Sequence, residues 1–438
     1  MQGAPLWCGR IARCSEAGQR VKMAILPGGR FMPMSLAEHL RQFRAVLAVC
    51  KTGSTSQAAT ILPLSQSAIA RAIRELETAV GVPIFDRTAR GMLPTTIGQL
   101  LAHRAERAFA QLRQGEHEAL SLAEQDPPHV PAGRFAGTCG YRHLQTYIVF
   151  CEVRSETATA GRLQVSQPAV NQTLRQLEHM LGVRLFHRSA RGVRLTESGE
   201  VVLQRAKLAL DEFRQASEDL AAFQGRMRGR LVIGSLPLSS GALVPRAVDR
   251  VLAQYKDLSV SIVDGTYDGL MYQLRHADID VLVGALRPQA PGADVIQTPL
   301  FEDTLSVVVR KGHPLEGLTI AGLDQLVGES WIAPLHGTPA RDAFERAFHA
   351  VGVQPPSTVL EVNSAIVLQA LLQDSDRLAL LSRRQMFHGI SAGAFSVLPV
   401  PVKETTRYIG LTMRADADPN ITMKSFIHEL GRLAASLV

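Results

Sequence analysis

The chain has 438 residues, of which 46% are hydrophobic and 20% charged, an ordinary composition for a globular protein of about two to four domains. It contains no run of 18 or more apolar residues and no secretory signal, which excludes a membrane-spanning helix and favours the cytoplasm. The net charge of +7 divides into +11 for residues 1–230 and −4 for residues 231–438, so we expect the first part to bind a polyanion.

The first clear pattern along the chain is an internal repeat. Residues 64–98 and 165–199 agree at 15 of 35 positions when they are aligned without a gap at an offset of 101. A leader precedes the first copy; we expect it to be disordered, and Met23 and Met34 are alternative starts. The repeat predicts a leader (1–35), a first unit with a long helix (36–126), a Pro- and Gly-rich linker (127–140), a second unit with its helix (141–226) and a C-terminal region (230–438).

Each copy predicts three helices and a β-hairpin. In the second copy a helix begins after Ser166, with apolar side chains on one face and polar side chains on the other. Two helices precede it, and "RSARGVRLT" after it indicates a hairpin that turns at Gly192. The first copy repeats this pattern from Ser65 to Gly91, and both serines are predicted N-caps. Helices in this order, the last two joined by a tight turn, predict a helix-turn-helix with a wing.

The polar helix face and the basic wing are suited to DNA. Gln, Asn and Arg side chains match base edges in the major groove, and arginines on a wing reach the phosphate backbone. The alternative, an amphipathic helix with a merely solvated face, is disfavoured because cap, turn, polar face and basic wing occur together twice. The candidate DNA-binding residues are Ser65, Gln66, Ser67, Arg71, Arg74, Arg87 and Arg90 in the first copy and Ser166, Gln167, Pro168, Asn171, Gln172, Arg175, Arg188 and Arg191 in the second.

Both copies resemble the winged helix of LysR-type transcriptional regulators. The second copy matches the family pattern in its Ser-Gln-Pro-Ala start, its Leu-Glu pair, its Gly-Val-Arg-Leu-Phe-His-Arg strand, its Arg-Gly turn and its Leu-Thr-Glu-Ser-Gly end. The first copy departs from this pattern at Ser67, Ala70 and Pro94, which suggests weaker or different base selectivity. The second copy departs at Arg154, where the first keeps the Gly of a "TGS" turn.

A long helical pattern follows each unit, and in the family such a linker helix pairs antiparallel with its partner to form a dimer. A packing seam is predicted in the second helix from the spacing of Leu203, Leu210, Phe213 and Leu220, with an ordinary core helix as the competing interpretation. The duplication leaves two hypotheses open. The two units pair within one chain as a pseudo-dimer that reads unlike half-sites, or each unit pairs with its counterpart in another subunit.

Residues 230–438 alternate short apolar strands with helices, which predicts an α/β domain with a largely parallel sheet. The resemblance implies two α/β subdomains with a small-molecule cleft between them, like a periplasmic binding protein. Ligands bind beyond the carboxyl ends of strands in such sheets, where the loop "GSLPLSSG" is expected. The candidate effector-binding residues are Leu238, Ser239 and Ser240 in that loop, then Thr266, Asn363 and Ser364, and, from the resemblance, His313, Pro334 and Gly337.

No catalytic motif, metal-ligand spacing or phosphate-binding loop occurs in the sequence, and the five cysteines are predicted to be reduced. We therefore expect a regulator that is not an enzyme, with no cofactor or metal, controlled by an organic or aromatic acid or a sugar. Its expected partners are double-stranded DNA, the effector, RNA polymerase and further copies in a homodimer or homotetramer, with no membrane. The alternatives are a small-molecule binding protein or hydrolase with a helical oligomerisation module, and an architectural DNA-binding protein without an effector.

Overall fold

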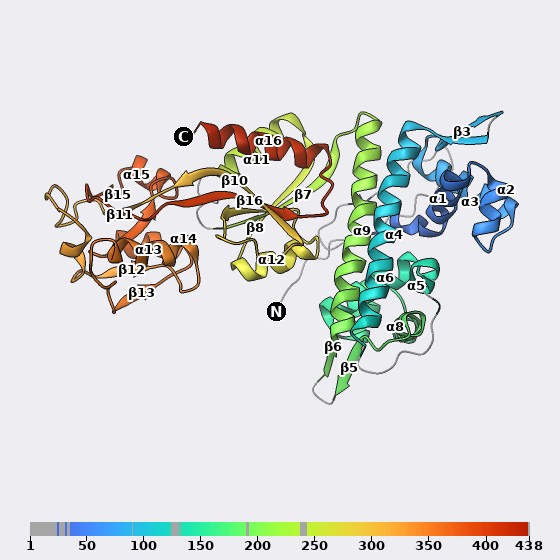
Figure 1. Cartoon of the computed structure of the whole chain (residues 1–438), viewed down its shortest axis with the longest axis horizontal. Coiled ribbons are helices and arrows are strands. Elements are labelled where there is room, and N and C mark those ends of the chain that lie inside the picture. Colours follow the sequence, from blue (N-terminus) through green and yellow to red (C-terminus); the bar gives the residue numbers. More distant parts are fainter. Residues whose placement is uncertain are drawn as a thin grey trace, which may run out of the picture.

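The computed structural model describes residues 24–25, 31–32, 36–89, 91–123, 131, 133–189, 192–236 and 243–436 (Figure 1). Two short strands, β1 (Ala24–Ile25) and β2 (Phe31–Met32), pair antiparallel within the leader. The rest of the leader, and with it most of the predicted disorder, lies outside the described residues.

The first unit contains the predicted helices and hairpin. Its elements are η1 (Leu36–His39), α1 (Leu40–Thr52), α2 (Thr55–Ile61), α3 (Gln66–Val80), β3 (Phe85–Thr88), β4 (Gly91–Pro94) and the long helix α4 (Thr96–Ser121). Helix α3 buries Ile69, Ile73 and Leu76, so its opposite face is exposed. The tight turn between α2 and α3 sets that face outward, as the helix-turn-helix pattern predicts.

The second unit repeats the same order. Its elements are α5 (Arg134–Thr138), α6 (Tyr141–Val153), α7 (Glu156–Leu163), α8 (Gln167–Leu181), β5 (Phe186–Ser189), β6 (Gly192–Leu195) and the long helix α9 (Glu197–Phe223). Helix α5 lies in the segment predicted as a linker and buries Phe135 against the core of the units. That segment is therefore partly packed.

Motif residues join the hairpin to the long helix in both units. In the second unit, Glu178 Oε1 accepts a hydrogen bond from the Leu185 N–H at 2.9 Å, and Thr196 caps α9 by accepting from the Gly199 N–H at 2.9 Å. A Cβ atom on Gly199 would lie 2.3 Å from the Leu185 carbonyl oxygen, so no larger residue fits there. The equivalent contacts in the first unit are made by Glu77, Thr95 and Gly98.

Helices α4 and α9 pack side by side and antiparallel within the one chain (Figure 1). Ser198, near the start of α9, donates a hydrogen bond to the carbonyl oxygen of Ala119, near the end of α4, at 2.9 Å. Near the middle of the pair, the ring of Phe213 in α9 lies 5.1 Å from that of Phe43 in α1 and 6.2 Å from that of Phe109 in α4. The two units therefore share one core. That core includes the predicted seam of Leu203, Leu210, Phe213 and Leu220.

The C-terminal region folds into two subdomains, and the one nearer the long helices has a five-stranded sheet in the order β10-β16-β9-β7-β8 (Figure 1). Strand β7 pairs parallel with β8 and β9, whereas β16 pairs antiparallel with β9 and β10. The elements are β7 (Arg228–Ser235), α11 (Leu243–Gln254), β8 (Asp257–Asp264), α12 (Tyr267–Arg275), β9 (Val281–Ala285), β10 (Val295–Asp303), β16 (Arg407–Arg414) and α16 (Ile421–Ala435).

The outer subdomain has a second five-stranded sheet, in the order β13-β12-β14-β11-β15. Its first three strands are parallel, and β11 is antiparallel to both of its neighbours. The expectation of a largely parallel sheet holds for strand direction, because only β16 in the first sheet and β11 in the second run against the other strands, but half of the strand pairings are antiparallel. The elements are β11 (Leu305–Arg310), η2 (Leu323–Leu326), β12 (Trp331–Ala333), α13 (Pro339–His349), β13 (Val359–Glu361), α14 (Ala365–Gln373), β14 (Leu378–Ser382), α15 (Phe387–Ser391) and β15 (Phe395–Val397).

Candidate nucleic-acid interface and effector domain

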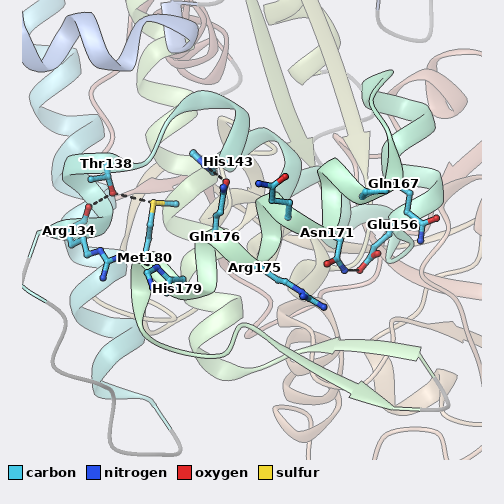
Figure 2. A pocket seen from close by; sticks show the side chains of 12 residues that line it. Arg134, Thr138, His143, Glu156, Gln167, Asn171, Arg175, Gln176, His179 and Met180 are labelled. Carbon is cyan, nitrogen blue, oxygen red and sulfur yellow. Dashed lines mark hydrogen bonds between the residues drawn. The ribbon is translucent and has the colours of Figure 1, made fainter.

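The exposed face of α8 lies in an open groove of about 1150 Å³ (Figure 2). The groove contains five of the predicted residues of the second unit, Gln167, Pro168, Asn171, Gln172 and Arg175. Further basic side chains border it at the far end of α8, where Arg134 Nη2 lies 3.0 Å from His179 Nδ1. The sequence interpretation missed Arg134 and His143, because neither belongs to the recognition helix. The groove thus combines base-edge donors and acceptors with positive charge.

The recognition helix of the first unit, α3, presents fewer amides and more arginine. Ser65 occupies the predicted N-cap and accepts a hydrogen bond from the Ala68 N–H at 3.2 Å, whereas Ser166, at the equivalent cap, makes no such side-chain bond. Arg71 and Arg74 are exposed on the same face as Gln66 and Ser67. The structure thus places all five predicted helix residues of this unit on one outward surface.

The two hairpins have the geometry expected of wings. Gly91 and Gly192 open the second strands with φ of 118° and 116°, a conformation that favours glycine. Arg87 is exposed on β3, while Arg90, Arg191 and the side chain of Arg188 lie outside the described residues. The unusual Arg154 adopts φ of 52°, the left-handed cap that Gly53 provides with φ of 75° in the first unit.

The pairing of α4 and α9 is pseudo-two-fold, because equivalent arginine contacts recur at an offset of 101. Arg104 Nε lies 2.8 Å from Asp219 Oδ2, and Arg104 Nη1 lies 3.3 Å from Glu212 Oε2. Across the pseudo-axis, Arg205 binds the two residues at the equivalent positions, Glu118 at 2.6 Å and Gln111 at 2.8 Å. The wings β3–β4 and β5–β6 lie at opposite ends of this helix pair (Figure 1).

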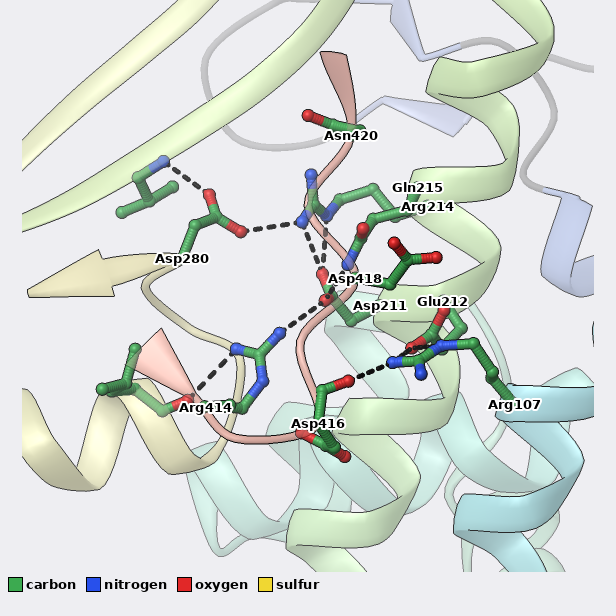
Figure 3. Close-up of polar contacts among 12 residues, drawn as sticks. Arg107, Asp211, Glu212, Arg214, Gln215, Asp280, Arg414, Asp416, Asp418 and Asn420 are labelled. Atoms are coloured by element: carbon green, nitrogen blue, oxygen red, sulfur yellow. Dashed lines mark hydrogen bonds and ion pairs between the residues drawn. The ribbon is translucent and has the colours of Figure 1, made fainter. Parts of the chain in front are cut away.

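The inner subdomain is fastened to α9 by buried charges (Figure 3). Arg214 forms ion pairs with Asp211 at 2.6 Å, with Glu218 at 2.8 Å and with Asp280, next to β9, at 2.8 Å. Arg414, at the end of β16, lies 3.2 Å from Asp211. Burial raises the pKa of Glu218 and of Asp280. Burial also opposes ionisation of Asp211, but Arg214 and Arg414 outweigh it and hold the pKa of that carboxyl below its usual range.

The loop after β16 reaches the other long helix as well. Arg104 Nη1 donates to the carbonyl oxygen of Asp418 at 3.0 Å, and Gln111 Nε2 donates to Asp416 Oδ2 at 2.7 Å. Arg107 donates to the Asp416 carbonyl oxygen (Figure 3). The inner subdomain therefore contacts the linker helices of both units.

Apart from His313, the predicted effector residues that are described follow the carboxyl ends of parallel strands. Thr266 follows β8 and caps α12, and Ser364 follows β13 and caps α14, so each hydroxyl oxygen accepts a backbone N–H. Pro334 and Gly337 follow β12, and Asn363 is exposed beside Ser364. The loop with Leu238, Ser239 and Ser240 lies outside the described residues.

His313 has a local role in the structure. It is buried, its Nδ1 accepts from the Leu315 N–H at 3.0 Å, and its Nε2 lies 3.2 Å from the Asp376 carbonyl oxygen. Neither ring nitrogen is left for a ligand in this arrangement. Its predicted contact with the effector stays a prediction.

An arginine that the sequence interpretation missed connects the two subdomains. Arg287, just after β9, donates from Nη1 to the Gly337 carbonyl oxygen at 2.9 Å, and its guanidinium carbon lies 4.2 Å from the centre of the Tyr267 ring. Gln297 fixes the backbone of Arg287 by two hydrogen bonds of 3.0 and 3.2 Å. The Arg287 guanidinium thus contacts the predicted Gly337 and lies over the ring of Tyr267, the residue that follows the predicted Thr266. Its only sequence signal is its position at the carboxyl end of a strand.

Sequence comparisons identify both parts of the chain. Residues 40–99 and 141–200 each match the bacterial regulatory helix-turn-helix protein of the lysR family, and residues 224–435 match the LysR substrate binding domain. The chain belongs to the LysR family of bacterial transcriptional regulators. A LysR regulator is a DNA-binding protein controlled by a small-molecule effector and is not an enzyme, so the hydrolase alternative is set aside.

Relatives support the same assignment. The HTH-type transcriptional regulator GalR of Pseudomonas putida is 36% identical over 379 residues, which cover 86% of this chain and 92% of that protein. PcaQ of Agrobacterium fabrum is 31% identical over 297 residues, which cover 68% of this chain and 96% of that protein. The GalR match is too long to be confined to residues 141–438, so it extends into the first unit.

Solved structures show the same fold. The crystal structure of CbnR, a LysR family transcriptional regulator, has a TM-score of 0.51 at 19% identity and covers 68% of this chain and 99% of its own. Full-length CbnR complexed with its target DNA also gives a TM-score of 0.51, at 20% identity, and covers 67% of this chain and 99% of its own.

Among the helices of the described residues, none has the length and apolar content needed to cross a bilayer.

Proposed function

We propose that one chain of this LysR regulator is a complete DNA-reading unit that binds two unlike half-sites. The observation that carries this proposal is the pseudo-two-fold pairing of α4 with α9, with the Arg104 and Arg205 ion pairs repeated at an offset of 101. A linker-helix dimer that joins two chains in the family would here be formed within one.

The dimensions of the helix pair support two half-sites per chain. Helix α4 has 26 residues, so it is about 39 Å long at 1.5 Å per residue. Successive major grooves on one face of DNA are about 34–36 Å apart. Units at the two ends of such a pair are therefore spaced suitably for adjacent turns of one duplex (Figure 1).

The two half-sites would differ because the two reading faces differ. Helix α8 carries Asn171 and Gln172 where α3 carries Ala70 and Arg71. Amides distinguish bases by donor and acceptor pairs, whereas arginines favour guanine or bind phosphate. Helix α8 supplies most of the sequence preference, and α3 supplies more of the charge.

The effector is an organic anion, bound where the two subdomains face each other. Arg287 supports this class because it places a guanidinium beside Tyr267 and Gly337. An aromatic acid that binds would raise the melting temperature by mass action, and Arg287→Met would abolish that rise. An equal rise in the variant, or a rise with neutral sugars alone, would contradict an anionic effector.

Because its target is DNA, we expect the regulator to act in the cytoplasm, where contact with RNA polymerase is also expected.

The experiment that tests the DNA proposal is recovery of genomic DNA bound by the intact protein and by two double variants. We expect Asn171→Ala with Arg175→Ala to erase one half of each composite site, and Arg71→Ala with Arg74→Ala to weaken the other half. Arg250→Ala with Arg432→Ala removes two exposed arginines from the effector domain and is the matched charge control. If each half-site needs a separate chain, or no discrete sites are recovered, the proposal is wrong.

A further inference from the structure

A carboxylate outside the recognition helix contacts the amide of Asn171. Glu156 begins α7, and its Oε1 accepts a hydrogen bond from Asn171 Nδ2 at 2.9 Å (Figure 2). Both side chains line the groove along α8, and both are half-buried. No DNA contact was assigned to Glu156 from the sequence.

An ionised carboxylate fixes the orientation of an amide, because it accepts hydrogen bonds and donates none. The side of Asn171 that faces Glu156 must therefore be Nδ2 and not Oδ1. One N–H of the amide is used in this bond, and the second N–H and Oδ1 remain for another partner. A donor next to an acceptor is the pattern that matches N7 and the N6 amino group of adenine in the major groove.

The first unit lacks this pair at both positions. At an offset of 101, Glu156 corresponds to Thr55 and Asn171 to Ala70. Thr55 instead accepts a hydrogen bond at 3.3 Å from Nε2 of Gln66, at the start of α3. A methyl group such as that of Ala70 contacts the thymine methyl and cannot select adenine by hydrogen bonding. The difference between the two reading surfaces thus involves the recognition helix and the helix before it in each unit, α7 and α8 in the second and α2 and α3 in the first.

We propose that Glu156 is a positioning residue for base recognition, which holds the Asn171 amide so that the second unit selects adenine at one position of its half-site. This inference rests on the proposed function, since it requires α8 to enter the major groove. Glu156 acts through Asn171 and not through a base contact of its own. The first unit, with Thr55 and Ala70, selects thymine or makes no selection at the equivalent position.

The test measures base preference at each half-site position, by competition binding against duplexes that carry every single substitution. Glu156→Ala is expected to lower the preference for adenine at one position by about fivefold or more, while the other positions keep theirs. Glu156→Gln, which keeps one acceptor oxygen, is expected to lower it less. Because Glu156 acts through Asn171, Glu156→Ala should have no further effect on the preference in an Asn171→Ala background.

A transplant and a charge control sharpen the test. Thr55→Glu with Ala70→Asn is expected to create an adenine preference in the half-site of the first unit. Glu152→Gln removes a different carboxylate, one that pairs with Arg162 on the exposed surface of the second unit, and should alter overall affinity without changing the base preference.

Two outcomes would overturn the inference. The first is an unchanged preference in Glu156→Ala, and the second is a loss that persists when Asn171 is already alanine, because Glu156 would then contact the base itself. Both are distinguishable from failure of the proposed function, in which each half-site would need a separate chain or the unaltered protein would show no base preference at any duplex.

Discussion

The two ends of the α4–α9 pair have the same ion pairs in different surroundings. The side chain of Arg104 is 5% exposed, and that of its partner Asp219 is 13% exposed. At the related end, the side chains of Arg205 and Glu118 are 24% and 27% exposed. The difference arises because the loop after β16 covers Arg104 and leaves Arg205 open. The two DNA-binding units are thus related by pseudo-symmetry, but the single effector domain covers the Arg104 end of their helix pair more fully than the Arg205 end.

This asymmetry distinguishes the two units in a way that their sequences do not show directly. The effector domain follows α9 in the chain and contacts it through Asp211 and Arg214, but it also contacts α4 through Arg104 and Arg107. Strand β16 leads straight into the loop that makes the α4 contacts. The first unit is therefore connected to the effector domain by side-chain contacts alone, whereas the second is connected both by such contacts and by the chain itself.

The largest expected effect is on stability, where substitution of Arg104 should cost much more than substitution of Arg205. Arg104→Met leaves Asp219 and Glu212 buried with less compensation, so we expect a loss of about 3–5 kcal/mol in the free energy of unfolding. Arg205→Met breaks a partly exposed pair and is expected to cost about 1 kcal/mol or less. Denaturant unfolding of the full chain, followed by circular dichroism, measures both.

A double variant in the loop after β16 tests whether this loop is what buries Arg104. Asp416→Asn with Asp418→Asn weakens the contacts of that loop with α4, so the cost of Arg104→Met should fall in this background while the cost of Arg205→Met stays the same. Equal losses for the two arginines in the unaltered protein would show that the effector domain does not cover one end of the helix pair in solution.

Much of each unit could be predicted because its signals are local. Glu178 and Thr196 accept hydrogen bonds from the backbone N–H groups of Leu185 and Gly199, seven and three residues further along the chain. The same spacing recurs at Glu77, Thr95 and Gly98. The family resemblance then supplied the two subdomains, which the alternation of strands and helices alone did not separate.

The unpredicted features depend on contacts between distant segments. The sequence left open whether the long helices pair within or between chains, because the same apolar seam serves both. Arg287 and Glu156 were missed because a single charged residue at a strand end or a helix start carries no pattern. The predicted His313 was chosen from the resemblance, and its ring is engaged by neighbouring backbone.

A smaller effect is expected where the two long helices approach closely at one end. A Cβ atom on Gly115 of α4 would lie 2.8 Å from Cβ of Arg205, whereas the equivalent residue in α9 is already Ala216. Gly115→Ala gains helix propensity but must push α9 away, so we expect a net loss of about 1 kcal/mol. Gly161→Ala in α7, where the added methyl meets open space, should instead stabilise by up to about 1 kcal/mol. Thermal unfolding of the two variants gives the comparison, and stabilisation by both would mean that the helices do not pair this closely within one chain.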